Sequence, residues 1–227
     1  QKTAYEIYQC DWSSDVCSSD LSASSSSKTS FPTLLVAAVA TLFFSASLAN
    51  AATIVWGNTA VDFNANGSWS GGVAPGTTDI GNFAAGTASF NPSLSASKTI
   101  GGLSFSSGTA AWTFTGNASG RVLTIGSSGI VSSGANTQTF SSANLGISLS
   151  ATQSFQSDST GGLTFASTLA SFSITGGTTL TLTGVSASAN NLIAASIGST
   201  TAAITKSGAG MWTLTGTNAY KIGRAHV

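Results

Sequence analysis

Short segments in which apolar and polar side chains alternate, each closed by glycine, recur along the chain beyond residue 98. The clearest of them is Trp212-Thr213-Leu214-Thr215-Gly216. Strict alternation places Trp212 and Leu214 on one face of a β-strand and the two threonines on the other. A Gly-x-Gly sequence precedes the segment and Gly-Thr-Asn closes it, and both are typical of turns. The segment therefore predicts a short, half-buried strand between two turns.

The same pattern returns at separations that indicate a repeat. Gly-Gly-Leu-Ser-Phe at 101–105 is matched by Gly-Gly-Leu-Thr-Phe at 161–165. The segment 112–116 is matched in the same way by 212–216. Both separations are multiples of about 20 residues, a repeat length found in solenoid proteins. No segment after residue 52 has a convincing helical period.

Two all-β architectures fit these short strands. A β-sandwich also has short strands separated by turns, roughly every 8–12 residues. A parallel β-helix, or β-solenoid, stacks such strands in successive coils, and the internal repeats favour this fold. We therefore predict an all-β parallel β-helix with coils of about 20 residues. The side chains expected to face inward are Leu103, Phe105, Trp112, Phe114, Leu123, Ile125, Leu163, Phe165, Phe172, Ile174, Leu180, Leu182, Trp212 and Leu214.

Residues 206–220 resemble the autotransporter-associated β-strand repeat, whose units read approximately K-x-G-x-G-x-x-T-L-x-G-x-N-x-Y-x-G. The positions that match this pattern are Lys206, Gly208, Gly210, Thr213, Leu214, Gly216, Asn218 and Tyr220. The match covers less than one full unit. The resemblance implies a passenger-type β-solenoid that a bacterium exports, in a protein that also has a translocating barrel or a sorting tail.

The two ends of the chain differ from the rest. Residues 1–21 and 221–227 match, in frame, the translation of a common sequencing-library adapter. We interpret both ends as adapter-derived and exclude them from the fold, which makes 22–220 a fragment of a natural chain. The only cysteines, glutamate and histidine of the sequence lie in these ends: Cys10, Cys17, Glu6 and His226.

Residues 22–51 have the features of a signal peptide. The apolar run at 34–44 is too short for a membrane span of about 20 residues. Ala49 and Ala51 form a small-x-small cleavage pattern, so the mature chain is expected to start at Ala52. A buried core helix and an uncleaved anchor are the alternatives. The prediction is a signal-peptide helix before the solenoid, and a protein that is extracellular or on the bacterial cell surface.

Residues 52–97 read as an N-terminal leader or cap, and 98–220 as a truncated array of solenoid repeats. The leader contains Trp56 and, before a Ser-Gly-Gly turn, Trp69. The end of a solenoid exposes unpaired strand edges and an open core, so it needs a cap. We expect the leader to close the first coil.

Charged side chains are few and balanced in the mature segment. Between residues 52 and 220 they are Asp62, Asp79, Asp158, Lys98, Arg121 and Lys206. Electrostatic binding of nucleic acid needs clustered Lys and Arg, which are missing from this stretch. Without His, Cys or Glu, these residues also cannot form a Ser-His-Asp triad or an ordinary zinc site. We expect no catalytic residue, cofactor or metal here, and turn or cap contacts for Asp62 and Asp79.

These features favour a structural or adhesive role. In this hypothesis an exported β-solenoid rod presents a Ser/Thr-rich surface to surface glycans or to other cells, and membrane attachment involves only parts outside this chain. One alternative is the scaffold of a carbohydrate-active enzyme whose catalytic coils lie beyond residue 220. Another is a carbohydrate-binding module in which Trp56 and Trp69 stack on sugar rings.

Overall fold

The computed structural model describes residues 51–84, 86, 90–158, 160–188, 190–199 and 201–218. The predicted adapter ends and the signal region up to residue 50 lie outside these residues. The described part is a parallel β-solenoid of about six turns, which confirms the predicted β-helix over the β-sandwich. Its one short helix is the 3-10 helix η1 (Asn66–Ser68), and no helix in the described ranges has the length and apolarity to cross a membrane.

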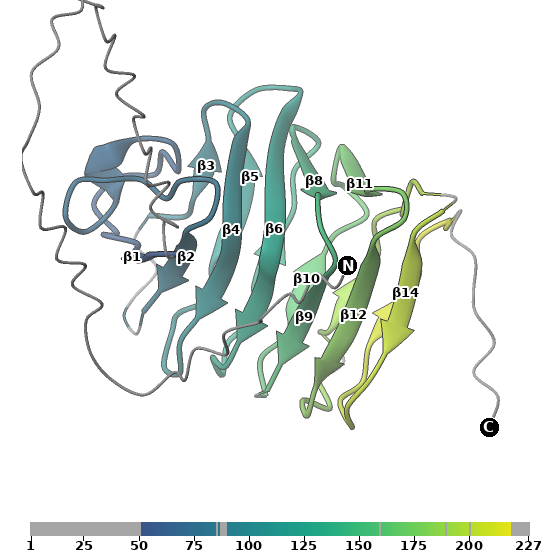
Figure 1. Cartoon of the computed structure of the whole chain (residues 1–227). Helices are drawn as coiled ribbons and strands as arrows, with labels where there is room; N and C mark the ends of the chain where they lie inside the picture. The colour runs from purple at the N-terminus through teal and green to yellow at the C-terminus, as the bar shows by residue number, and fades with distance from the viewer. Residues whose placement is uncertain are drawn as a thin grey trace, which may run out of the picture. The chain divides into compact units, whose positions relative to one another are not determined.

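Two sheets build the solenoid (Figure 1). The first has nine strands: β1 (Thr53–Val55), β2 (Ile80–Phe83), β4 (Lys98–Phe105), β6 (Arg121–Ser132), β8 (Leu145–Leu149), β9 (Gln153–Ser157), β11 (Ser171–Ile174), β12 (Thr179–Gly184) and β14 (Ala203–Lys206). The second has six: β3 (Ser93–Leu94), β5 (Thr113–Gly116), β7 (Gln138–Phe140), β10 (Leu163–Phe165), β13 (Leu192–Ile193) and β15 (Thr213–Leu214). All pairs between these strands are parallel.

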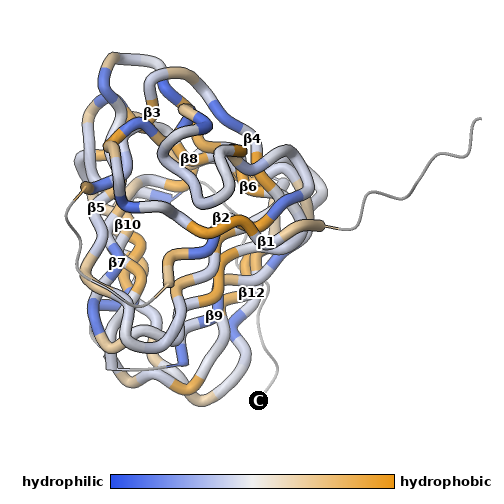
Figure 2. Tube along the Cα trace, turned by 90° about the vertical axis from the view of Figure 1, so that its left-hand side faces the viewer, coloured by the Kyte–Doolittle hydropathy of each residue, from blue (hydrophilic) through white to orange (hydrophobic). Residues whose placement is uncertain are grey.

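The long strand β6 shows how each coil bends. Its first half pairs with β8 at Arg121–Ile125, and its second half pairs with β9 at Ile130–Ser132. In the next coil the corresponding chain is therefore split into two strands. The same split recurs in β11 and β12, which follow β8 and β9 in register. Figure 2, viewed from the β1 end, shows the coils one behind another.

The coils are longer than the predicted length of about 20 residues. In the second sheet the successive partners in register are Phe114, Phe140, Phe165, Ile193 and Leu214. A coil therefore averages about 25 residues, which still lies within the range of solenoid repeats. The match between 112–116 and 212–216 thus spans four coils, and the repeat is real although its predicted length was too short.

The match between 101–105 and 161–165 does not correspond to whole coils, so reading it as a coil repeat was wrong. The segment 101–105 is part of β4 in the first sheet, whereas Leu163–Phe165 is β10 in the second. Both segments need the same alternation, because each buries two apolar side chains against the same interior. Similar local sequence therefore marks a similar environment and not an equivalent position in the coil.

The core is a continuous column of aromatic and aliphatic side chains. Phe114 stacks on Phe140 at a ring-centroid distance of 4.6 Å, and Phe140 stacks on Phe165 at 4.7 Å. Burying each such side chain stabilises the fold by roughly 1.5–3 kcal/mol. Twelve of the fourteen side chains predicted to face inward are buried. The other two, Trp212 and Leu214, are partly buried and pack against the core on β15 or beside it.

The predicted leader is continuous with the sheets. Strands β1 and β2 extend the first sheet beyond β4, and β3 extends the second beyond β5. Between β1 and β2 the chain turns back, and Trp69 forms an antiparallel bridge with Trp56. The Ser70 amide donates to the Val55 carbonyl at 2.8 Å. This antiparallel segment covers the β1 end of the stack.

Candidate functional site

The outward positions of the strands form columns of hydroxyl side chains, which we call the hydroxyl ladders. The first ladder is Thr99, Thr124, Ser148 and Ser173, one residue from each of β4, β6, β8 and β11 in direct register. Neighbouring parallel strands lie about 4.8 Å apart, so a hydroxyl recurs at about that interval. Alternation produces the ladder, because each member lies next to a buried residue of the core.

The second ladder lies on the other sheet. It consists of Thr113, Thr139, Thr164 and Thr213, with Leu192 as an apolar step between the last two. The Thr164 hydroxyl donates to the Asn190 carbonyl at 2.8 Å, so this member is already engaged.

Most of the first ladder is available to outside groups. The Ser173 hydroxyl donates weakly to the Ile147 carbonyl at 3.4 Å. Within the described ranges, the hydroxyls of Thr99, Thr124 and Ser148 make no hydrogen bond. Thr99 is exposed and the other members are half-buried. Each hydroxyl can donate one hydrogen bond and accept two, to water or to a polar partner.

The aspartates of the leader make turn contacts, as expected. Asp62 Oδ1 accepts hydrogen bonds from the Asn64 amide at 2.9 Å and from the Ser95 hydroxyl at 2.8 Å. Asp79 Oδ2 accepts from the Gly76 amide at 2.7 Å. These contacts give each carboxylate a structural role, because one of its oxygens accepts a backbone amide of its own turn.

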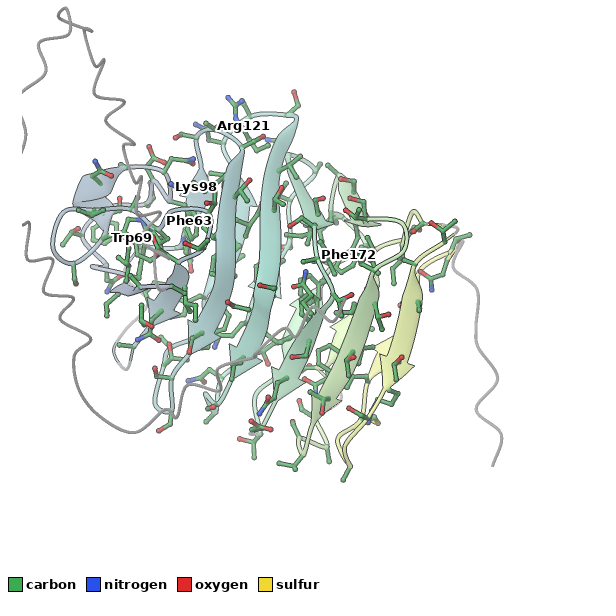
Figure 3. The ribbon with its side chains drawn as sticks, in the orientation of Figure 1. Phe63, Trp69, Lys98, Arg121 and Phe172 are labelled. Carbon is green, nitrogen blue, oxygen red and sulfur yellow. The ribbon has the colours of Figure 1, made fainter. Side chains whose placement is uncertain are left out.

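The other charged groups are spread over the coils. Lys98 and Arg121 lie at the same end of β4 and β6 (Figure 3), and Arg121 Nε donates to Asn117 Oδ1 at 3.4 Å. Asp158 follows β9 and accepts a hydrogen bond from the Gln156 side-chain amide. In the part of the chain that the structure describes, no three acidic, Cys or His side chains gather where they could hold a metal ion.

A shallow hollow of about 450 Å³ lies beside the ends of β9 and β12. Its lining residues are Asp158, Thr160, Val185, Ser186, Ala187 and Ser188. Asp158 is the single ionisable group among them, so the lining provides hydrogen-bonding groups but no acid and base pair. The alternation of the strands gave no signal for this hollow, because it is made by the turns that follow them.

Trp56 and Trp69 do not form a sugar-stacking platform. Only 5% of Trp56 and 2% of Trp69 is exposed. Their rings meet edge to face at 5.0 Å, and Trp69 Nε1 donates to the Phe63 carbonyl at 3.0 Å. A ring enclosed in the core cannot stack on a sugar, so the hypothesis of a binding module built on these two residues is wrong.

The residues of the repeat-like motif make contacts both within their own coil and with the preceding coil. The Lys206 ammonium donates to the carbonyls of Ser207 and Gly208, both at 2.7 Å, and so closes the turn after β14. Gly208 has a φ of +68°, which favours glycine. A Cβ on Gly216 would lie 2.3 Å from the Ala195 carbonyl oxygen, so the coils approach too closely there for a side chain.

The remaining described positions of the motif also form a strand or hydrogen-bond to the preceding coil. Thr213 and Leu214 form β15, and the Gly210 amide donates to the Gly184 carbonyl of the preceding coil at 2.8 Å. Asn218 Oδ1 accepts from the Ile197 amide at 3.0 Å. Tyr220 lies outside the described residues, as does Ala49 of the predicted cleavage pattern, whereas Ala51 and Ala52 are exposed.

Sequence reasoning missed the buried amide side chains at the corners. Gln138 Oε1 accepts from the Trp112 amide at 3.0 Å, and Gln138 Nε2 donates to the Ala110 carbonyl at 3.0 Å. Gln153 Nε2 likewise donates to the Ile125 carbonyl at 3.0 Å. A signal was available: each glutamine lies two positions before a buried phenylalanine, so the alternation of a strand places its amide inside.

Comparisons of the chain with protein-family models, with curated proteins and with solved structures find no match.

Proposed function

We propose that this chain is part of an exported cell-surface protein in which a β-solenoid, similar to an autotransporter passenger, has a structural or adhesive role. The observation that carries the proposal is the first hydroxyl ladder, four hydroxyl side chains in direct register across four strands. The signal-like region 22–51 and the repeat-like segment 206–220 support the export and the family likeness.

The proposed mechanism is geometric. A partner with hydroxyl or amide groups, such as a surface glycan or the surface of another cell, would bond to several rungs at once. Each hydrogen bond is weak in water, because it replaces one to solvent. Several bonds on one rigid scaffold bind more tightly together, because the first bond raises the effective concentration of the partner at the remaining hydroxyls. The six charged side chains between residues 52 and 220 balance, so the partner is expected to be polar and not strongly charged.

The proposal assigns no catalytic step to this part of the chain. Asp62 and Asp79 are committed to turns, and Asp158 has no second ionisable group beside it in the hollow. An acid and base pair needs two titratable groups within reach of the same reacting atoms.

Removing the hydroxyls of the first ladder tests the adhesive role. The variant carries Thr99→Val, Thr124→Val and Ser148→Ala, which remove the three hydroxyls left unbonded among the described residues, and the matched control carries Thr113→Val, Thr139→Val and Thr213→Val on the second ladder. Both proteins are assayed for retention on insoluble polysaccharides and on fixed bacterial cells. We expect several-fold weaker retention for the first variant only, with each substitution changing stability by about 0.5 kcal/mol or less. Equal retention by wild type and both variants would rule out the ladder as the adhesive surface.

A second candidate is carbohydrate binding in the hollow beside Asp158. Its volume of about 450 Å³ and its mixed lining of carboxylate, hydroxyl and Val185 favour a small polar ligand such as a sugar unit. We expect Asp158→Asn to weaken the binding of soluble oligosaccharides measured by calorimetry, and Asp62→Asn to leave it unchanged. If the wild type shows no heat of binding, carbohydrate binding in this hollow is ruled out.

A further inference from the structure

Ala52, the residue that would become the first of the mature chain, lies against a carboxylate. The Ala52 nitrogen donates to Asp79 Oδ1 at 2.9 Å. We propose that Asp79 is the receptor for the α-amino group that signal-peptide cleavage creates at Ala52. The processed chain would thereby fix its first strand with an ion pair that the unprocessed chain lacks. This inference rests on the export part of the proposed function.

The carboxylate is held in place before any processing. Its second oxygen, Oδ2, accepts from the Gly76 amide at 2.7 Å, and the Asp79 amide donates to the Gly76 carbonyl at 3.2 Å. The Asp79 carbonyl in turn accepts from the Gly101 amide of β4 at 2.8 Å. Because the turn and the neighbouring strand both hold Asp79, Oδ1 is directed at Ala52 without a further rearrangement.

Ala52 is held from its other side as well. Its carbonyl accepts from the Ile80 amide at 2.8 Å, and β1 begins at the next residue, Thr53. These contacts fix the position of the Ala52 nitrogen relative to the Asp79 carboxylate. A strand rises about 3.3 Å per residue, so a chain that started one residue earlier or later would not place its amino group there.

Cleavage changes the chemistry of this nitrogen. In the unprocessed chain it is a peptide N–H, a neutral group with one donor. Hydrolysis of the Ala51–Ala52 bond adds one water across it, leaving a carboxylate on the signal peptide and an ammonium on Ala52. The ammonium has three donors and a positive charge, and charge-assisted hydrogen bonds are roughly twice as strong as neutral ones.

Asp79 is the charged group that faces Ala52. The segments that meet here are 51–55, 75–83 and 98–105, and the only other charge in them is Lys98. Lys98 precedes Gly101 by three positions, which is about 10 Å along the strand. The amino group and the Asp79 carboxylate thus form an isolated pair of opposite charge.

The first experiment determines where the chain is processed. Residues 22–220 are expressed behind an initiator methionine in a bacterium with an active signal-peptide export pathway, and the N-terminus of the protein is read by mass spectrometry in the cellular and exported fractions. We expect the exported protein to start at Ala52. A chain that stays uncleaved inside the cell would overturn the export proposal and this inference together. Export with cleavage at another bond would overturn the inference alone.

The second experiment measures how readily the new α-amino group reacts. The processed protein is labelled at pH 7 with an N-hydroxysuccinimide ester, and the labelled N-terminal peptide is quantified. Only the uncharged amine attacks the ester carbonyl, which forms an amide and releases N-hydroxysuccinimide. A carboxylate neighbour favours the charged amine. We therefore expect Asp79→Asn to speed labelling about three- to ten-fold, and the matched control Asp62→Asn to leave the rate unchanged. Equal rates in wild type and Asp79→Asn would overturn the inference and leave export untouched.

A third measurement keeps the test decisive if Asp79→Asn does not fold. Labelling of the wild-type α-amino group is compared between the folded protein and the protein unfolded in urea, with a short peptide of the same N-terminal sequence as the reference for the effect of urea. The folded protein should react at least about three-fold more slowly after this correction. The same corrected rate in both states would overturn the inference.

Discussion

The two ends of the described solenoid differ in how completely the core is covered. At the β1 end an antiparallel segment folds back over the first coil, and Trp56, Phe63 and Trp69 are at most 5% exposed. At the other end β14 and β15 have a partner on one side only among the described residues. There Trp212 and Leu214 are half-buried, although they continue the inward pattern.

The difference shows what an aromatic core needs at its end. A parallel edge can accept a further parallel strand, because its N–H and C=O groups are unpaired on the outer side. The antiparallel bridge between Trp56 and Trp69 interrupts that pattern at the β1 end. The tryptophans of this end therefore cover the core, whereas Trp212 packs against the last described coil and stays partly exposed.

The largest expected effect comes from Trp69→Ala. Removing a fully buried aromatic ring costs about 3–5 kcal/mol of the free energy of unfolding, through lost transfer energy and the cavity left behind. Trp69 Nε1 also donates to the Phe63 carbonyl, which would lose its partner. The matched variant at the other end, Trp212→Ala, should cost less than half as much, because its ring is already partly exposed. Urea denaturation measures both, and equal losses would contradict the contrast between the ends.

An intermediate effect is expected for the buried amides. Gln138→Ala leaves the Trp112 amide without its acceptor inside the core, which costs about 1–3 kcal/mol. Asn218→Ala removes an equivalent acceptor from the Ile197 amide, but Asn218 is only half-buried. Water can replace it there, so a loss of about 0.5–1.5 kcal/mol is expected. Thermal unfolding compares the two, and a larger loss at Asn218 would show that the second end is better enclosed than its burial indicates.

The smallest expected effect is that of Lys206. Its ammonium donates to two turn carbonyls but is exposed, so Lys206→Ala should change the free energy of unfolding by less than about 1 kcal/mol. Lys206→Arg is the control, because it keeps the charge and the donors. Hydrogen exchange of the β14 amides is the sensitive measurement, and faster exchange confined to β14 and the following turn is expected. Faster exchange as far as β4 would contradict a local role.

The sequence by itself determined the direction of side chains within a strand. Alternation is local: Trp112 and Phe114 lie on one face because successive residues of any strand point to opposite faces. The same rule placed Leu163 and Phe165 inside without knowledge of the sheet to which they belong. The sequence also identified Asp62 and Asp79 as turn residues, because short polar side chains form hydrogen bonds to nearby backbone groups.

Only the tertiary structure decided which strands stack. The length of a coil, the partners of Phe114 and the split of the chain opposite β6 depend on register between distant segments. Register is set by packing of rings from successive coils and by turn length, and neither is encoded in a single strand. For the same reason the burial of Trp56 and Trp69, and the approach of Ala52 to Asp79, could not be read from alternation alone.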